Sequence, residues 1–335
     1  MPNKRFQNAL NVKEQKTPPI WFMRQAGRYH THYQSLKKKH TFENLCKTPE
    51  LAAEVALGPV REFDFDLAIL FSDILFILEG LGMDLVFDPG PILKEKLNEN
   101  NYKKYQNVEN AINFLEFQAK ALQLTRNKLS DDKSLIGFVG GPWTILRYAL
   151  GKNRNINLSE DIFINEYLEK VLIPLLKKNI NLQIKAGAEV VMILDSGLDD
   201  ISTLNLEIYL KNFLSELAAN SSKNIGYYAK GLSNEDYLKL CKLDFPGFGC
   251  DSSIDLKNLL KNNHNKFFQG NFDQNNLLLN LNDFKKELNN FCNNFISLSP
   301  KQRAGWICGL GHGINKDTNE EHVHIFIETI RKTFI

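Results

Sequence analysis

Short apolar runs alternate with longer amphipathic stretches along nearly the whole chain, and this alternation limits its fold most strongly. The runs are rich in β-branched and aromatic residues, and Val190–Leu194 contains no polar residue. A strand of this kind needs cover on both faces, as in a parallel sheet between helices. We expect strands at Ile20–Met23, Leu67–Phe71, Leu135–Val139, Glu189–Leu194, Ile225–Ala229, Phe245–Gly249, Lys266–Gln269 and Ala304–Cys308.

The stretches between these runs have apolar residues at helical spacing. One of them opens on Thr48-Pro49, and proline is favourable at a first helical position because its missing N–H is not needed there. We expect helices at Pro49–Phe63, Val108–Lys128, Glu160–Lys185, Leu204–Ala219, Glu235–Leu243, Asp255–Asn263, Leu277–Asn293 and Asn319–Thr333. About eight strand–helix units in 335 residues favour an α/β protein with a (β/α)8 TIM barrel over an open sheet. A glycine-containing segment follows Ile20–Met23, so the Met83–Phe87 run is an alternative first strand.

The composition limits the class of protein. With 41 Lys and Arg against 39 Asp and Glu, the chain lacks the cationic excess of a sequence-independent nucleic-acid binder. Its five cysteines are scattered and form no Cys-x-x-Cys pair, which indicates reduced thiols. The N-terminus lacks the apolar segment of a secretory signal, and no apolar run approaches the roughly 20 residues that span a bilayer. We therefore expect a cytoplasmic protein with one domain over residues 1–335, which binds neither nucleic acid nor membrane.

Polar residues that follow the expected strands are candidates for a functional site, because a barrel carries its catalytic residues there. Arg24 and Arg28 follow the first strand and can each bind a carboxylate through two charge-assisted hydrogen bonds, although such a pair can also lie on a solvated helix face. Asp73 is a lone carboxylate among apolar neighbours, which needs a donor or a cation if it is buried, and it could instead cap a helix. The other polar residues at strand ends are Ser72, Tyr148, Asp195, Ser196, Lys230, Asp251, Asn271, Asp273 and His312.

Three further patterns carry less weight. The Gly140-Gly141-Pro142 turn lacks the spacing and the lysine of a phosphate-binding loop, so nucleotide binding is not expected. His322 and His324 lie two residues apart on an expected helix and point in different directions, which argues against a shared metal. Glycines flank His312 on both sides and would allow a ligand to approach the backbone closely.

Six segments resemble the uroporphyrinogen decarboxylase family, in the family's order and over nearly the entire chain. They are Pro19–Tyr29, Phe71–Leu75, Gly137–Thr144, Asp195-Ser196, Gln269–Asn271 and Gly309–Gly313, and the first is the most specific. The resemblance implies a (β/α)8 barrel, usually a homodimer, without metal or organic cofactor. It also implies the stepwise removal of four acetate carboxyls from uroporphyrinogen III as CO2, which leaves coproporphyrinogen III in haem biosynthesis.

The resemblance also implies roles for residues. Asp73 matches the aspartate that accepts pyrrole N–H bonds, and Arg24 and Arg28 match the carboxylate-binding arginines; we take these three as catalytic residues. The expected substrate contacts lie partly in an N-terminal segment of about residues 18–45. They are Arg24, Gln25, Ala26, Gly27, Arg28, Lys37, Phe42, Phe71, Ser72, Asp73, Tyr148, Ser196 and His312. The chain departs from the family pattern at His30-Thr31-His32, Lys37, Gly197 and Ser252.

Two other functions are weighed against this one. A zinc- or corrinoid-type methyltransferase of the related barrel class binds zinc through His-x-Cys and a distant cysteine, because a thiol needs such activation. No His-x-Cys occurs in the chain. A non-catalytic tetrapyrrole-binding protein would be indicated by loss of Asp73 or Arg28, and both are present.

Overall fold

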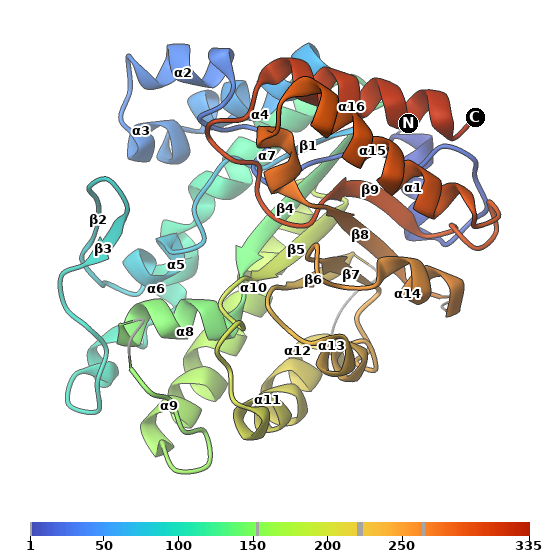
Figure 1. Cartoon of the computed structure of the whole chain (residues 1–335). Helices are drawn as coiled ribbons and strands as arrows, with labels where there is room; N and C mark the ends of the chain where they lie inside the picture. Colours follow the sequence, from blue (N-terminus) through green and yellow to red (C-terminus); the bar gives the residue numbers. More distant parts are fainter. Residues whose placement is uncertain (1, 152–153, 220–223, 263–264) are drawn as a thin grey trace.

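A computed structural model describes residues 2–151, 154–219, 224–262 and 265–335. Its centre is a curled sheet of seven parallel strands with helices outside it (Figure 1). In spatial order the strands are β1 (Leu67–Ile69), β4 (Ser134–Gly140), β5 (Val190–Asp195), β6 (Ile225–Ala229), β7 (Gly247–Cys250), β8 (Phe267–Phe272) and β9 (Trp306–Leu310). The seven strands expected from Leu67 onwards are confirmed within a few residues. Because all of them are parallel, their carboxyl ends meet at one edge.

The expected first strand, Ile20–Met23, is not a full strand. It lies between β9 and β1 and forms an isolated parallel bridge from Ile20 to Cys308. The Trp21 N–H donates to the Cys308 carbonyl at 3.2 Å, and the Ile20 carbonyl accepts from Asp66 N–H at 3.1 Å. The chain then turns, since Arg24 has a left-handed φ of 62°. The sheet is therefore a seven-stranded half-barrel whose two edges this segment bridges, and a complete eight-stranded barrel is not confirmed.

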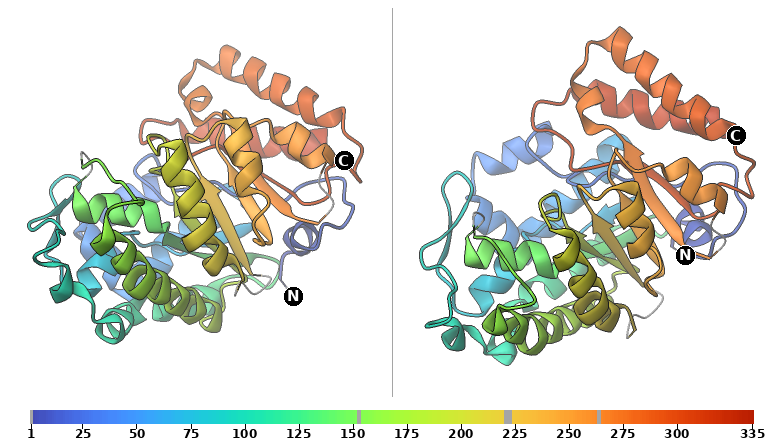
Figure 2. Two further views of the ribbon diagram at one scale, coloured as in Figure 1. Left: turned by 90° about the horizontal axis from the view of Figure 1, so that it is seen from below. Right: turned by 60° about the horizontal axis from the view of Figure 1, so that its bottom comes forward.

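The alternative first strand, Met83–Phe87, is wrong. Leu85–Phe87 forms β2, which pairs antiparallel with β3 (Pro91–Leu93) in a separate hairpin. The hairpin lies apart from the sheet, on the opposite side of the molecule from α1 (Lys4–Leu10) (Figures 1 and 2).

Each expected helical stretch contains helix, but several are divided. Val108–Lys128 separates into α6 (Val108–Phe114) and α7 (Glu116–Lys128), and two later stretches contain π-helical turns. The expected end at Asn263 lies outside the described residues. The remaining helices of these stretches are α4 (Pro49–Phe63), α9 (Ile162–Tyr167), η2 (Leu168–Leu172), α10 (Ile173–Lys185), α11 (Thr203–Tyr209), η3 (Leu210–Leu214), α12 (Ser215–Ala219), α13 (Asn234–Leu240), α14 (Leu256–Asn262), α15 (Leu281–Ile296) and α16 (Glu320–Thr333).

Short helices near the strand ends were not predicted. They include α2 (Thr31–Lys37) and α3 (Phe42–Lys47) in the N-terminal segment and α5 (Phe76–Gly80) after β1. The others are α1, the 3-10 helices η1 (Tyr102–Tyr105) and η4 (Gln274–Leu278), and α8 (Pro142–Leu150). Among the described residues, no helix combines the length and apolarity needed to cross a membrane.

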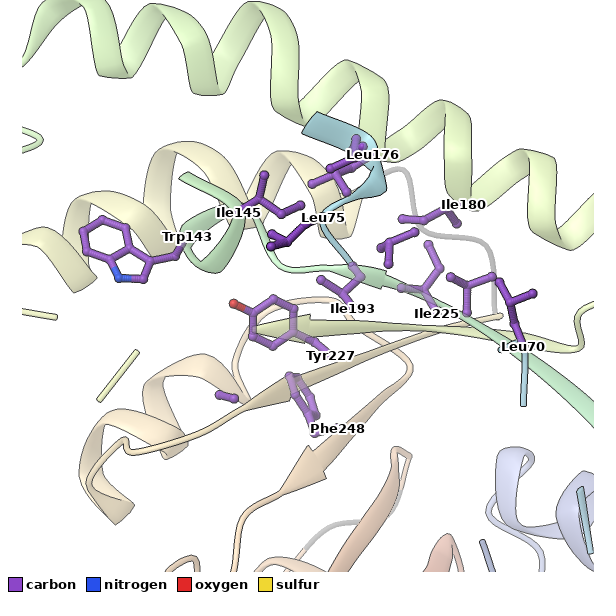
Figure 3. Packing of buried hydrophobic residues seen from close by; sticks show 14 of the residues in the cluster. Leu70, Leu75, Trp143, Ile145, Leu176, Ile180, Ile193, Ile225, Tyr227 and Phe248 are labelled. Carbon is purple, nitrogen blue, oxygen red and sulfur yellow. The ribbon is translucent and has the colours of Figure 1, made fainter. Parts of the chain in front are cut away.

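The core has two layers because successive side chains of a strand point to opposite faces. The outer layer lies between the sheet and the helices and includes Leu70, Ile145, Leu176 and Ile193 (Figure 3). The inner layer fills the concave face of the sheet. Its members are Phe6, Ala9, Trp21, Met23, Leu67, Ile69, Ile136, Val190, Met192, Tyr228, Phe267 and Ile307. Phe6 and Ala9 belong to α1, which closes the amino end of the sheet, so the open end is the one where the strands finish.

Candidate active site

The N-terminal segment presents Arg24 at the open end of the sheet. The buried Gln25 anchors this turn: its Nε2 donates to the Leu67 carbonyl at 2.9 Å, and its Oε1 accepts from Phe22 N–H at 3.2 Å. The side chain of Arg24 is exposed and packs on Gly313, where an added Cβ would lie 2.5 Å from Arg24 Cδ. The Gln25 side chain is thus committed to the backbone, and its role is to place Arg24.

Arg28 and Lys37 are the other two cations of the N-terminal segment that were expected at the site. Both side chains are exposed. Within the described ranges, neither they nor Arg24 form a salt bridge, whereas Arg147 and Arg331 pair with Asp200 and Asp64. Cations without an acidic partner can bind the carboxylates of a ligand at no cost of breaking an existing pair.

Asp73 follows β1 and lies half-buried at the same end of the sheet. Its Oδ1 accepts a hydrogen bond from Leu75 N–H at 2.9 Å, and no described residue donates to Oδ2. Asp73 does not cap a helix, since α5 begins at Phe76 with Leu75 in the capping position. Burial raises the pKa of Asp73, while the Leu75 N–H and the charge of Arg24 oppose the rise. One oxygen of this carboxylate therefore remains available to a donor from outside the protein.

Aromatic side chains form a wall beside Asp73. The Phe71 ring lies 5.6 Å from Tyr33 and 6.0 Å from Phe42, and Phe42 lies 4.9 Å from Phe87 of the β2–β3 hairpin. The residue between Phe71 and Asp73, Ser72, accepts a hydrogen bond from Gln118 Nε2 at 2.9 Å. Phe87 joins this aromatic cluster, and it was not among the residues expected from sequence because its run was interpreted only as a strand.

Asp195 ends β5 but faces away from the open end. It is fully buried on the outer face and accepts four hydrogen bonds: Thr144 N–H at 2.8 Å, Thr144 Oγ1 at 2.6 Å, and the hydroxyls of Tyr209 and Tyr227 at 2.6 Å each. In Figure 3 the Tyr227 hydroxyl points toward the side of Trp143, at the start of α8. Burial raises the pKa of Asp195, and its donors counter part of the rise.

This buried carboxylate positions two expected site residues. Thr144 Oγ1 donates to Asp195 and accepts from Gly197 N–H at 2.9 Å, so it joins the first turn of α8 to the loop after β5. Tyr148 lies one turn further along α8, and Ser196 precedes Gly197; both are half-buried. Asp195 thus has a structural role: it holds in place the first turn of α8 and the loop after β5, the two segments that carry Tyr148 and Ser196.

His312 completes the site at the end of β9. It is half-buried, and its ring stacks on Tyr228 with centroids 6.0 Å apart. Burial and the charges of Arg24 and Lys230 lower the pKa of His312 to about 4, against an opposing effect of Asp251. Arg24 packs on Gly313 next to His312, and its charge lowers the pKa of both Asp73 and His312, as expected if the three residues lie near one another at the open end.

Three other strand-end residues serve the fold. The buried Asp251 accepts from Gly231 N–H at 2.7 Å and from Ser253 N–H at 2.8 Å. Asn271 Nδ2 donates to the carbonyls of Asp251 at 2.8 Å and Ile254 at 2.7 Å. Asp273 accepts from Asn275 N–H at 2.9 Å at the start of η4. These bonds shape the loops around the open end.

Two features elsewhere do not compete with this site. A surface hollow of about 620 Å³ lies beside η4 and α15, and of the polar strand-end residues considered for the site only Asp273 is on its lining. Over the part of the chain that the structure describes, no group of three or more His, Cys, Asp or Glu side chains could hold a metal ion.

Comparison with known proteins agrees with the resemblance seen in the sequence. The family model described as Uroporphyrinogen decarboxylase (URO-D) matches residues 1–333. A protein named Uroporphyrinogen decarboxylase from Orientia tsutsugamushi (strain Ikeda) is 33% identical over 340 residues, which cover 96% of each chain. Its namesake from Francisella tularensis subsp. novicida is 30% identical over 345 residues, covering 98% of each. Among solved structures, a methyltransferase from Methanosarcina mazei shares the fold, with a TM-score of 0.76 and 16% identity over 99% of both chains.

Proposed function

This chain belongs to the uroporphyrinogen decarboxylase family and is a carboxy-lyase of that type, and we propose that its reaction takes place around Arg24, Asp73 and His312. The enzyme converts uroporphyrinogen to coproporphyrinogen by removing the acetate carboxyls as CO2. The observation that carries the placement is the position of Arg24, which packs on Gly313 next to His312, at the end of the sheet where Asp73 follows β1. Arg24 forms no salt bridge among the described residues, and its charge lowers the pKa of both Asp73 and His312.

The cations of the N-terminal segment bind the substrate's carboxylates in this proposal. Uroporphyrinogen carries eight carboxylates around four inward-facing pyrrole N–H groups. Arg24 and Arg28 offer two parallel donors to a carboxylate, and Lys37 offers a point charge. The backbone of Ala26 and Gly27, between the two arginines, approaches the substrate closely, while Gln25 holds the turn.

The remaining side chains orient the macrocycle. The faces of Phe42 and Phe71 contact its apolar carbon skeleton, and Ser72 lies beside them. The hydroxyls of Tyr148 and Ser196, which the Asp195 network positions, bind carboxylates on the far side.

Asp73 stabilises the charge that develops during the reaction. Protonation of a pyrrole ring makes it a cation and provides the electron sink that decarboxylation needs. The Oδ2 atom of Asp73, which has no donor within the described residues, accepts from the pyrrole N–H groups and faces this cation. A charge pair at 4 Å is worth about 1 kcal/mol in water but about 4 kcal/mol at an effective dielectric of 20. The half-buried position of Asp73 therefore matters for the rate.

Each cycle consumes one proton overall. When the bond between the methylene carbon and the carboxylate breaks, CO2 leaves and its bonding pair moves into the protonated ring. The methylene carbon then takes a proton to become a methyl group, and the ring releases the proton that it gained. Four such cycles yield coproporphyrinogen.

A zinc- or corrinoid-type methyltransferase is not favoured. The neighbour from Methanosarcina mazei shares the fold at 16% identity, and a fold does not fix a reaction. The chain has no His-x-Cys element for zinc. A purely tetrapyrrole-binding role is not favoured either, since Arg28 and Asp73 are both in place.

The family resemblance supports three further parts of the proposal: the III isomer as substrate, a homodimer, and catalysis without a metal or organic cofactor. It also supports a cytoplasmic location, with which the five free thiols agree.

The test is an anaerobic assay of the purified protein with uroporphyrinogen III and no added cofactor, with and without a chelator. After oxidation of the products, chromatography is expected to show porphyrins with seven, six, five and four carboxyls in both samples. If neither sample yields any of these products, the proposed function is wrong; activity that the chelator abolishes would contradict the metal-free reaction alone.

A further inference from the structure

Tyr228 is a buried tyrosine beside the proposed site that the reaction described above does not use. It lies in β6 with its side chain on the inner face, among Met192, Phe267 and Ile307. Its hydroxyl oxygen lies 2.9 Å from the carbonyl oxygen of Gly311 and 2.9 Å from Nδ1 of His312. The Tyr228 and His312 rings are stacked with 14° between their planes.

These two contacts determine where the protons lie. A carbonyl oxygen only accepts, so the single hydroxyl proton of Tyr228 points to Gly311. The remaining contact is a hydrogen bond only if Nδ1 of His312 carries a proton and donates it to the Tyr228 oxygen. In the neutral imidazole the other nitrogen, Nε2, then has its lone pair free. Over the described residues Nε2 has no protein partner and is not buried.

We propose that Tyr228 is a positioning residue that holds His312 as the Nδ1–H tautomer, so that Nε2 takes up a proton when the substrate's carboxylates enter the site. The uptake rests on the proposed function, whereas the tautomer rests on the protein alone. The proton comes from bulk water and forms the Nε2–H bond of an imidazolium, which can then donate to a carboxylate.

The charges around His312 explain why substrate would trigger this step. Arg24 from the N-terminal segment and Lys230 after β6 face the ring and disfavour a positive charge, while Asp251 after β7 favours one. With burial, they keep the pKa of His312 at about 4 without substrate. Substrate carboxylates bound to Arg24 would cancel its repulsive charge and add attractive ones beside the ring, so the imidazole would gain a proton near neutral pH.

The tautomer is tested by nitrogen NMR of the ligand-free protein labelled at histidine nitrogens, with His312→Gln to assign the signal. We expect His312 to be protonated at Nδ1 in the wild type and to show a population protonated at Nε2 in Tyr228→Phe, which keeps the ring but removes the hydroxyl. Tyr227→Phe is the matched control, because its hydroxyl binds Asp195 on the other face and its loss should leave the His312 tautomer unchanged. A wild-type signal from Nε2–H, or a Tyr228→Phe spectrum identical to wild type, would overturn the assignment.

Proton uptake is tested by following the same signal against pH with and without uroporphyrinogen III under anaerobic conditions. We expect the midpoint of His312 to rise by about two to three pH units on binding, from about 4 back toward the ordinary histidine value of about 6.5. We expect kcat/KM of Tyr228→Phe to fall about fivefold, the equivalent of one net hydrogen bond. An unchanged midpoint in the presence of bound substrate would overturn the uptake alone. If uroporphyrinogen does not bind, the proposed function fails together with the uptake, and the tautomer result still stands.

Discussion

Two aspartates follow parallel strands of the same sheet and have opposite surroundings. Asp73, after β1, is half-buried at the open end and has one donor among the described residues, the Leu75 N–H at 2.9 Å. Asp195, at the end of β5, is fully buried on the outer face and accepts four hydrogen bonds. Burial raises the pKa of both carboxyls.

The difference shows that the role of a buried carboxylate depends on its hydrogen-bond donors and on the face of the sheet that it occupies. The four donors of Asp195 satisfy it and join α8, α11 and β6 to the end of β5. Asp73 has one oxygen without a protein donor and faces a cation, Arg24. An incompletely satisfied carboxylate costs stability, and such a cost is typical of a functional site.

Loss of the structural carboxylate should have the largest effect on stability. We expect Asp195→Ala to lower the free energy of unfolding by about 3–5 kcal/mol, because it leaves several buried hydroxyls and a backbone N–H without an acceptor, at a cost of about 1–3 kcal/mol each. Urea unfolding measures the change. A loss below about 1 kcal/mol would contradict the structural role of Asp195. If Asp195→Ala does not fold, Tyr227→Phe, which removes one of the four donors, should fold and lose about 1 kcal/mol.

A smaller effect is expected at the arginines that are proposed to bind the substrate's carboxylates. Arg28→Lys keeps the charge but replaces two parallel donors by one point charge, so KM should rise about tenfold with kcat within about twofold. Steady-state kinetics under anaerobic conditions check this. Arg61→Lys is the matched control, since Arg61 is exposed on α4, pairs with Glu54 and is not among the expected site residues. An unchanged KM for Arg28→Lys would remove Arg28 from the substrate clamp.

The smallest effect concerns stability against pH. The folded-state pKa of Asp73 is raised above its ordinary value of 3.8, so its charged form is less favourable in the folded than in the unfolded chain. This penalty is fully present above the folded pKa and disappears as pH falls toward 3.8. Asp73→Asn should therefore be slightly more stable than wild type at pH 7, with a difference that shrinks in acid. Equal stability of the two proteins at every pH would contradict the penalty.

Much of the fold could be predicted from sequence because its strands are locally distinct. The run Val190–Leu194 identifies β5 without its neighbours. The segment Ile20–Met23 has a similar composition, but its backbone hydrogen bonds depend on its neighbours β9 and β1. The segment also ends at the left-handed turn of Arg24, and no local sequence pattern indicates either feature. The β2–β3 hairpin was missed because Met83–Phe87 carries the same apolar signal as a buried strand.

Residues of the candidate site could be predicted from sequence where a residue type is costly to place among its sequence neighbours. Asp73 stands out because it is a carboxylate among apolar residues, and His312 stands out because it lies between two glycines. The faces were not predictable: both sides of a covered strand are apolar, so nothing local separates Asp195, which points outward, from Ser196, which follows it. Tyr228 was missed because an aromatic residue within Ile225–Ala229 is ordinarily part of the core.

Turnover of Asp73→Asn, measured anaerobically with uroporphyrinogen III, tests most directly the claim that the incompletely satisfied carboxylate stabilises the charge that develops during the reaction. The asparagine can still accept from Leu75 N–H, so the variant should fold as the wild type does. Loss of about 4 kcal/mol of charge stabilisation predicts a kcat lower by roughly a thousandfold. A folded Asp73→Asn protein with near-wild-type kcat would contradict the account.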